Sequence, residues 1–141
     1  MQLTRHTDYA LRTLIQAALK PEGERLSVAE ITETYDLSRS HVMKIVQKLG
    51  HEGFLRNIRG KGGGIELGMH PDEINIGAVV RAMEANLQVI DCSLPYCRLL
   101  PECRLTSIFG EAMKAFLNVI DQYTLSDLLN NRDDLVRLLL D

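Results

Sequence analysis

The chain has 141 residues, a net charge of −3 and a hydrophobic fraction of 45%. Its length favours one compact domain, and an aromatic content of 5% without Trp favours a helical core over a β-sandwich. No apolar run approaches the length of a membrane span, and residues 1–6 lack the apolar core of a signal peptide. We therefore expect a cytoplasmic protein without a membrane partner, whose three cysteines act as ligands or reactive thiols rather than in disulfides.

The acidic net charge hides an uneven distribution of charge along the chain. Residues 37–64 carry six basic residues against the single acid Glu52, whereas residues 71–141 carry six basic residues against eleven acids. Because a local patch rather than the net charge contacts phosphate, the first segment is a candidate for DNA binding. The alternative is a solvated face with no such role.

The first 53 residues predict three helices. Residues 7–20 have a helical apolar period that Pro21 ends, and the capping box of Ser27 and Glu30 predicts a second helix from 28 to 35. Ser38 can cap a third helix that ends near Gly50 or Gly53. Its exposed face is expected to carry bases and hydrogen-bonding groups: Arg39, Ser40, His41, Lys44, Gln47, Lys48 and His51. This is the helix–turn–helix pattern, although an ordinary αα-hairpin would look similar.

The next segment predicts a β-hairpin. Apolar runs at 54–58 and 65–67 flank a glycine-rich turn at 59–64, and a hairpin directly after a recognition helix is typical of a winged helix. We therefore predict a mainly α fold in which residues 1–70 form a winged helix–turn–helix domain, a three-helix core with a β-hairpin wing. Its partner would be double-stranded DNA with a palindromic operator. The residues expected to contact this DNA are Ser38, Arg39, Ser40, His41, Lys44, Lys48, Arg59, Lys61 and Gly62.

Residues 71–141 predict a second segment, which we expect to bind the cluster and to form the dimer. A short helix around residues 76–83 precedes a loop at about 87–104, which holds all three cysteines. Residues 105–123 form the longest periodic stretch, and its apolar face exceeds what one small domain needs to cover. We expect this helix to pack on a second copy in a homodimer, the alternative being packing on its own domain. The tail is expected to be helical again.

Cys92, Cys97 and Cys103 have the spacing C-x4-C-x5-C. Thiolates suit iron–sulfur clusters, zinc and copper, but the C-x2-C pairs that zinc sites favour are absent from the sequence. Since a cluster takes four ligands, the fourth would have to come from another residue type. A thiol switch, a zinc site or no role for the thiols remain open alternatives. No nucleophile elbow, metal-hydrolase His pair or phosphate loop is found, so we do not expect an enzyme.

Several motifs together resemble one family, the winged-helix iron–sulfur transcription regulators. They are Met1-Gln-Leu-Thr4 with Thr7-Asp8-Tyr9, Leu37-Ser38 with Lys44-Ile45, Arg59-Gly-Lys-Gly-Gly63, Ile76-Gly77, and the three cysteines in order. The resemblance covers nearly the whole chain. It is greatest to the nitric-oxide-sensing branch, because the branch for cluster homeostasis has a His where this chain has Thr106.

The resemblance implies a repressor that senses nitric oxide through an iron–sulfur cluster. The cluster is expected to be 4Fe–4S, with 2Fe–2S as the alternative, and to be held by the three cysteines and by Asp8 of the partner subunit. Arg12 lies four residues after Asp8 and is expected to pair with it as a switch. Two alternative functions remain: a general redox or iron-status regulator and, in a different class, a zinc- or thiol-containing redox protein. For Asp8 the alternative is that it only favours the positive end of its own helix.

Overall fold

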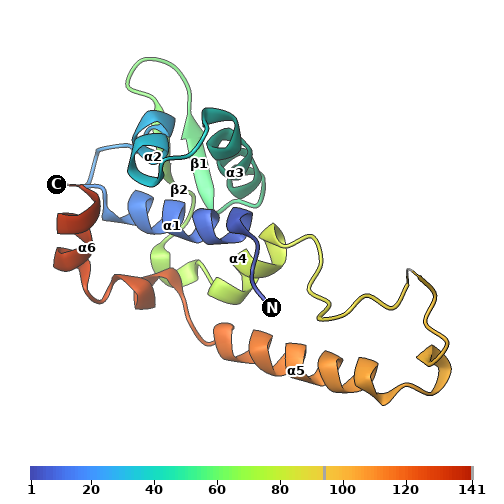
Figure 1. The fold of residues 1–141 in the computed structure, drawn as a ribbon. Helices are drawn as coiled ribbons and strands as arrows, with labels where there is room; N and C mark the ends of the chain where they lie inside the picture. Colours follow the sequence, from blue (N-terminus) through green and yellow to red (C-terminus); the bar gives the residue numbers. More distant parts are fainter. Residues whose placement is uncertain (94, 141) are drawn as a thin grey trace.

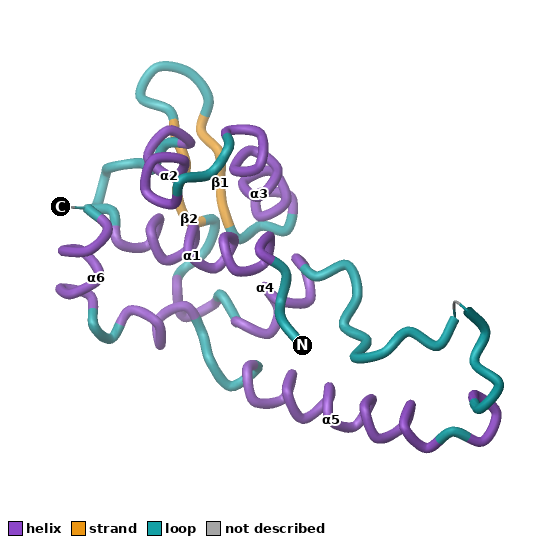
Figure 2. The backbone as a smooth tube through the Cα atoms, viewed as in Figure 1, coloured by secondary structure: helices purple, strands orange, loops and turns teal. Residues whose placement is uncertain are grey.

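The computed structural model describes residues 1–93 and 95–140, so that residue 94 of the predicted cysteine loop and residue 141 of the C-terminal segment lie outside the described residues. The fold is mainly helical with one two-stranded sheet, as predicted (Figures 1 and 2). The elements are α1 (Arg5–Leu19), α2 (Val28–Tyr35), α3 (Arg39–His51), β1 (Leu55–Ile58), β2 (Gly64–Leu67), α4 (Ile76–Met83), α5 (Arg104–Ile120) and α6 (Arg132–Leu139), with 3-10 turns η1 (Pro71–Glu73), η2 (Leu100–Glu102) and η3 (Leu125–Leu129). No helix among these residues is both long and apolar enough to cross a membrane.

Side-chain caps explain where the first three helices begin. Thr4 caps α1 by accepting from the backbone N–H of Thr7, which is why this helix starts before the predicted residue 7. Ser27 and Glu30 form the predicted capping box at the start of α2. Ser38 caps α3 through the N–H of His41, as predicted.

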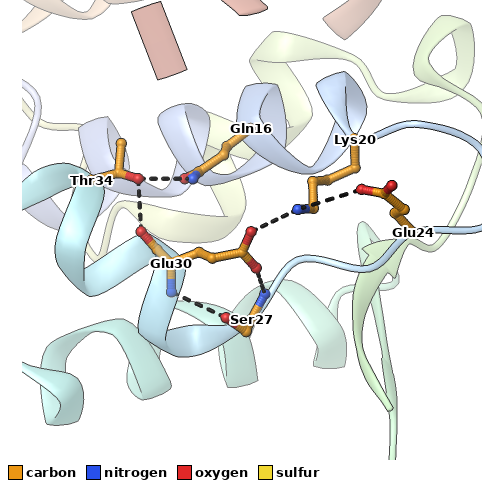
Figure 3. A network of polar contacts seen from close by, with 6 residues as sticks. All are labelled: Gln16, Lys20, Glu24, Ser27, Glu30 and Thr34. Atoms are coloured by element: carbon orange, nitrogen blue, oxygen red, sulfur yellow. Dashed lines mark hydrogen bonds and ion pairs between the residues drawn. The ribbon is translucent and has the colours of Figure 1, made fainter. Parts of the chain in front are cut away.

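A polar network joins α1 to α2 (Figure 3). Lys20 Nζ lies 2.6 Å from Glu30 Oε1, and the other oxygen of Glu30 accepts from the N–H of Ser27. Burial alone would raise the pKa of Glu30, but the hydrogen bonds from Lys20 and Ser27 hold it below its usual value. Gln16 Nε2 donates to Thr34 Oγ1 at 3.0 Å on the next turns of the same two helices. The network therefore fixes α2, the first helix of the helix–turn–helix pair, against α1.

The core draws on both halves of the chain. Strands β1 and β2 pair antiparallel, and Leu26 adds a bridge to Ile65. Leu14 of α1 and Ile45 of α3 share one hydrophobic cluster with residues from beyond position 70, namely Ile74, Val79, Met83 and Leu125. The predicted division into residues 1–70 and 71–141 therefore does not separate two cores, and it stays a prediction about function.

The cysteine loop and α5 form an arm that extends from this body (Figures 1 and 2). None of the residues of α5 is buried, although the helix is strongly amphipathic in sequence. Leu105, Ile108 and Val119 of its apolar face are each at least half exposed. The structure thus leaves this face uncovered instead of packing it on the chain's own core.

The C-terminal end of α5 is fixed to α4 by an ion pair. Arg81 Nη1 and Nη2 lie 2.5 Å and 2.8 Å from the two carboxylate oxygens of Asp121, and this pairing lowers the pKa of Asp121. Gly77 is buried directly beneath the pair, and a Cβ atom there would overlap the Asp121 carboxylate. A glycine at this position is therefore what allows α4 and the arm to meet.

We expect Gly77→Ala to destabilise the protein by about 1–3 kcal/mol, because the added methyl group has no room and separates Arg81 from Asp121. Urea unfolding measures the change. Gly110→Ala is the matched control, since nothing lies within 4 Å of its missing Cβ and alanine favours the helix of which it is part. Equal stability of the two variants would show that the junction tolerates the extra atom.

Candidate nucleic-acid interface and cysteine loop

The exposed surface of α3 is a stripe with helical spacing. Val42, Ile45, Val46 and Leu49 are at most 5% exposed and face the core. On the opposite side, four exposed side chains follow the i, i+3, i+4, i+7 pattern: Ser40, Met43, Lys44 and Gln47. This stripe includes Met43, which the analysis of the sequence did not place among the contact residues.

His41 differs from its expected position. It is half-buried, and its ring stacks on that of His6 with centroids 6.1 Å apart. The ring of Tyr9 meets it edge-on, with centroids 5.9 Å apart. The prediction that His41 is exposed was wrong, because α1 crosses α3 at this flank. Burial lowers the pKa of His6, and the neighbouring His41 lowers it further. His41 therefore joins the first turn of α1 to the first turn of α3.

Fewer than six of the basic residues in segment 37–64 are free of ion pairs with the residues that the structure describes. Lys48 lies 3.3 Å from Glu52, and Arg56 pairs with Glu66 across the hairpin. The other four bases are exposed and form no ion pair with any residue that the structure describes: Arg39, Lys44, Arg59 and Lys61. These four charges, two on α3 and two at the tip of the hairpin, have no competing ion pair among the described residues, and contact of Lys48 with DNA stays a prediction.

Arg25 braces the tip of the hairpin. Its Nη1 donates to the carbonyl oxygen of Gly62 at 2.7 Å, and its Nε lies 3.3 Å from Glu66. Gly62 has φ +75°, which favours glycine, and a Cβ on Gly63 would collide with the backbone of the turn. Arg25 was missed in the sequence because it lies in a polar turn far from the hairpin, where nothing in the pattern marks it.

A groove of about 660 Å³ separates α3 from the hairpin and the start of α2. The side chains along it combine charged, amide and apolar groups: Arg39, Met43, Lys44, Gln47, Asn57 and Arg59. Three of the nine residues predicted to contact DNA therefore line this groove: Arg39, Lys44 and Arg59. Ser38 is exposed at the start of α3, next to Arg39, and is the N-cap residue of this helix.

The three cysteines are free and half-buried on the loop before α5. Cys92 borders a hollow of about 750 Å³ between the loop and α5, whose apolar wall includes Leu87, Ile90 and Phe109. Cys103 is the N-cap residue of α5, and η2 lies between it and Cys97. Within residues 1–93 and 95–140, no three His, Cys, Asp or Glu side chains are close enough to hold a metal ion. The structure thus brings the thiols to one loop without bringing them into ligating contact.

Asp8 and Arg12 form a two-point ion pair on α1. Arg12 Nε and Nη2 lie 3.0 Å and 2.8 Å from the two oxygens of Asp8, and both side chains are about half exposed. The guanidinium also lies over the rings of Tyr9 and Tyr35, 5.2 Å and 6.0 Å from their centroids. Burial raises the pKa of Tyr35 to about 12, so its hydroxyl stays protonated and donates to the carbonyl oxygen of Arg12.

A helix–turn–helix pair, a braced β-hairpin and four exposed bases on one side define a winged-helix DNA-binding protein. Residues 3–131 match the family Rrf2, described as iron-dependent transcriptional regulator. The chain belongs to this family of transcription regulators.

Similar proteins agree with this assignment. The chain is 44% identical over 142 residues to the HTH-type transcriptional regulator NsrR of Bacillus subtilis strain 168. The match covers 99% of this chain and 97% of that protein. The solved structure of CymR (YrzC), the global cysteine regulator of B. subtilis, has a TM-score of 0.69 at 27% identity and covers 91% of this chain and 95% of CymR. IscR of T. potens has a TM-score of 0.74 at 22% identity, with 93% and 88% covered, and supports the fold alone.

Proposed function

We propose that the chain is a homodimeric cytoplasmic repressor. With its iron–sulfur cluster bound it binds a palindromic operator, and it dissociates from this operator when nitric oxide is present. The observation that carries this proposal is the set of three cysteines on one loop beside an apolar hollow, in a member of an iron-dependent regulator family. The likeness to NsrR supports nitric oxide as the signal.

The chemistry of the donor set fits such a cluster. Three thiolates are soft ligands that iron–sulfur clusters use, and we assign them to Cys92, Cys97 and Cys103. A carboxylate is a harder and weaker ligand, which suits the one position that must respond to a signal. We assign this fourth position to Asp8 of the partner subunit and the cluster type to 4Fe–4S, with 2Fe–2S as the alternative. When bound, the cluster supplies iron that reacts with nitric oxide.

The residues of α1 give the fourth ligand a second partner. Asp8 is held by two hydrogen bonds from Arg12, and Arg12 is in turn positioned by Tyr9 and Tyr35. A carboxylate with such a neighbour can leave a metal without being left unpaired, which lowers the cost of release. We therefore assign Arg12 the role of the switch residue that receives Asp8.

The cysteine loop connects the ligands to the rest of the arm. Because Cys103 is the N-cap residue of α5, holding its thiolate fixes the start of that helix. The opposite end of α5 is already fixed to the body by Arg81 and Asp121. An ordered loop would therefore set the direction of the proposed dimer helix, and with it the spacing of the two α3 helices that a palindrome requires.

An anaerobic titration with nitric oxide tests this function. Protein purified without oxygen is expected to be coloured by iron–thiolate absorption and to bind duplexes that it selects from a random pool. Adding nitric oxide should remove the absorption and the DNA binding over the same range of equivalents. A colourless protein, or DNA binding that persists after the colour is lost, would contradict the proposal. The same anaerobic protein, treated with a donor solution that has already released its nitric oxide, is the control for other effects of the added reagent.

A further inference from the structure

Met43 is the one apolar side chain of α3 that the fold does not bury. It is 50% exposed, whereas the four other large apolar residues of this helix are at most 5% exposed. Nor does it lie at the edge of the helix surface, because the exposed residues Arg39, Ser40 and Gln47 surround it at spacings of three and four residues. Its place is thus in the middle of the stripe that the recognition helix presents.

The surroundings of Met43 favour DNA as its partner. It borders the groove between α3 and the hairpin together with Arg39 and Arg59, two of the four bases without an ion pair among the described residues. An apolar protein partner would have to desolvate these charges, whereas a phosphate backbone would pair with them. The charges around Met43 therefore favour nucleic acid over an apolar protein surface.

We propose that Met43 reads the C5-methyl group of a thymine in the major groove of the operator. In that groove the base edges present hydrogen-bond donors and acceptors, and the thymine methyl is the apolar group among them. Met43 can form no strong hydrogen bond to a base edge, but its flexible thioether chain can cover a methyl group closely. The inference rests on the proposed DNA recognition and adds the base that this position selects.

Deoxyuridine substitution isolates this contact, since it removes the thymine methyl and leaves the base pairing unchanged. We would select the operator from a random pool with the full chain and then replace each thymine with deoxyuridine, one symmetric pair at a time. Burying one methyl group corresponds to about a fourfold change in affinity per half-site. Because each symmetric replacement removes the methyl group from both half-sites, the wild-type protein is expected to lose about 16-fold in affinity at one thymine pair, measured by competition.

Met43→Ala should bind thymine and deoxyuridine operators equally at that position, and Met43→Leu should keep the preference. Lys44→Ala is the matched control on the same stripe: it should weaken binding to both operators by the same factor and leave their ratio unchanged. Because Met43 is half exposed, neither of its variants is expected to unfold, which thermal melting checks.

The outcomes separate this inference from the proposed function. If an operator is selected but no thymine methyl matters, or if Met43→Ala keeps the methyl preference, the inference is overturned and DNA recognition stands. If the chain selects no sequence at all, the proposed repressor function fails and the inference fails with it. A change in the ratio with Lys44→Ala as large as that with Met43→Ala would also overturn the assignment to Met43.

Discussion

Replacing Val119 with Glu is expected to turn the proposed dimer into monomers and to abolish tight operator binding with it. Val119 lies on the apolar face of α5 and is 54% exposed in the single chain, so a glutamate there stays solvated as long as the chain is alone. In a dimer that covers this face, the same carboxylate would be buried without a partner, at a cost of several kcal/mol. We expect the dissociation constant of the dimer to rise more than about 100-fold.

Sedimentation over a range of concentrations measures the oligomeric state directly. Asn118→Glu is the matched control, because this neighbouring residue is exposed on the other side of α5 and should leave the dimer intact. Ile108→Glu, near the N-terminal end of the same apolar face, should behave like Val119→Glu. If both apolar variants remain dimeric, the interface lies elsewhere and the uncovered face of α5 needs another explanation.

The sequence predicted the local structure well because its signals act over a few residues. The capping box of Ser27 and Glu30 and the cap at Ser38 depend on neighbours three residues away, and the structure contains both. The glycine-rich turn at 59–64 likewise predicted the hairpin, where φ is positive at Gly60, Gly62 and Gly64. Helix and strand positions could therefore be predicted to within a few residues.

Contacts between distant segments could not be predicted in the same way. The flank of α3 that contacts α1 depends on how the helices cross, so His41 was placed in solvent although it stacks on His6. Met43 was assigned to neither face of the helix, and the structure leaves it 50% exposed. Arg56 is one of the six basic residues counted in segment 37–64, although it was not predicted to contact DNA, and the strand register puts it opposite Glu66. The surroundings of His41 and Arg56 thus depend on partners that lie in other elements.

The proposed ligands show the same limit more sharply. The i, i+4 spacing of Asp8 and Arg12 predicted their ion pair, which the structure contains. The spacing of the cysteines predicted that they share a loop, but not how the loop folds around a ligand, because spacing along the chain does not fix the distances between the three thiols. The assignment of four ligands, one of them from another chain, remains a proposal and calls for an experiment on dimers of mixed composition.

Each of the variants Cys92→Ala, Cys97→Ala and Cys103→Ala is expected to lose the cluster absorption and operator binding together. The chain has three cysteines, so no other thiol can replace the one removed. Asp8→Ala should keep three thiolates and is expected to form a cluster with altered absorption and an altered response to nitric oxide. Anaerobic absorption spectra and operator binding, recorded on the same samples, measure both effects.

Heterodimers decide from which chain the carboxylate comes. One chain carries Asp8→Ala and the other Cys97→Ala, and each carries its own affinity tag so that only mixed dimers are purified. If Asp8 ligates across the interface, the loop with three cysteines receives Asp8 from its partner, and one wild-type site forms per dimer. About half of the native clusters should then return, with the wild-type response to nitric oxide.

The reciprocal heterodimer is the matched control, because it contains the same substitutions in a different arrangement. Here one chain carries both Asp8→Ala and Cys97→Ala, and the other is wild type. Ligation across the interface leaves the intact loop facing a partner without Asp8, so its cluster should be altered, whereas ligation within one chain would make it native. Native clusters in this second dimer and altered ones in the first would show that Asp8 binds in its own chain. Altered clusters in neither dimer would show that another group holds the fourth position and that Asp8 serves only to pair with Arg12.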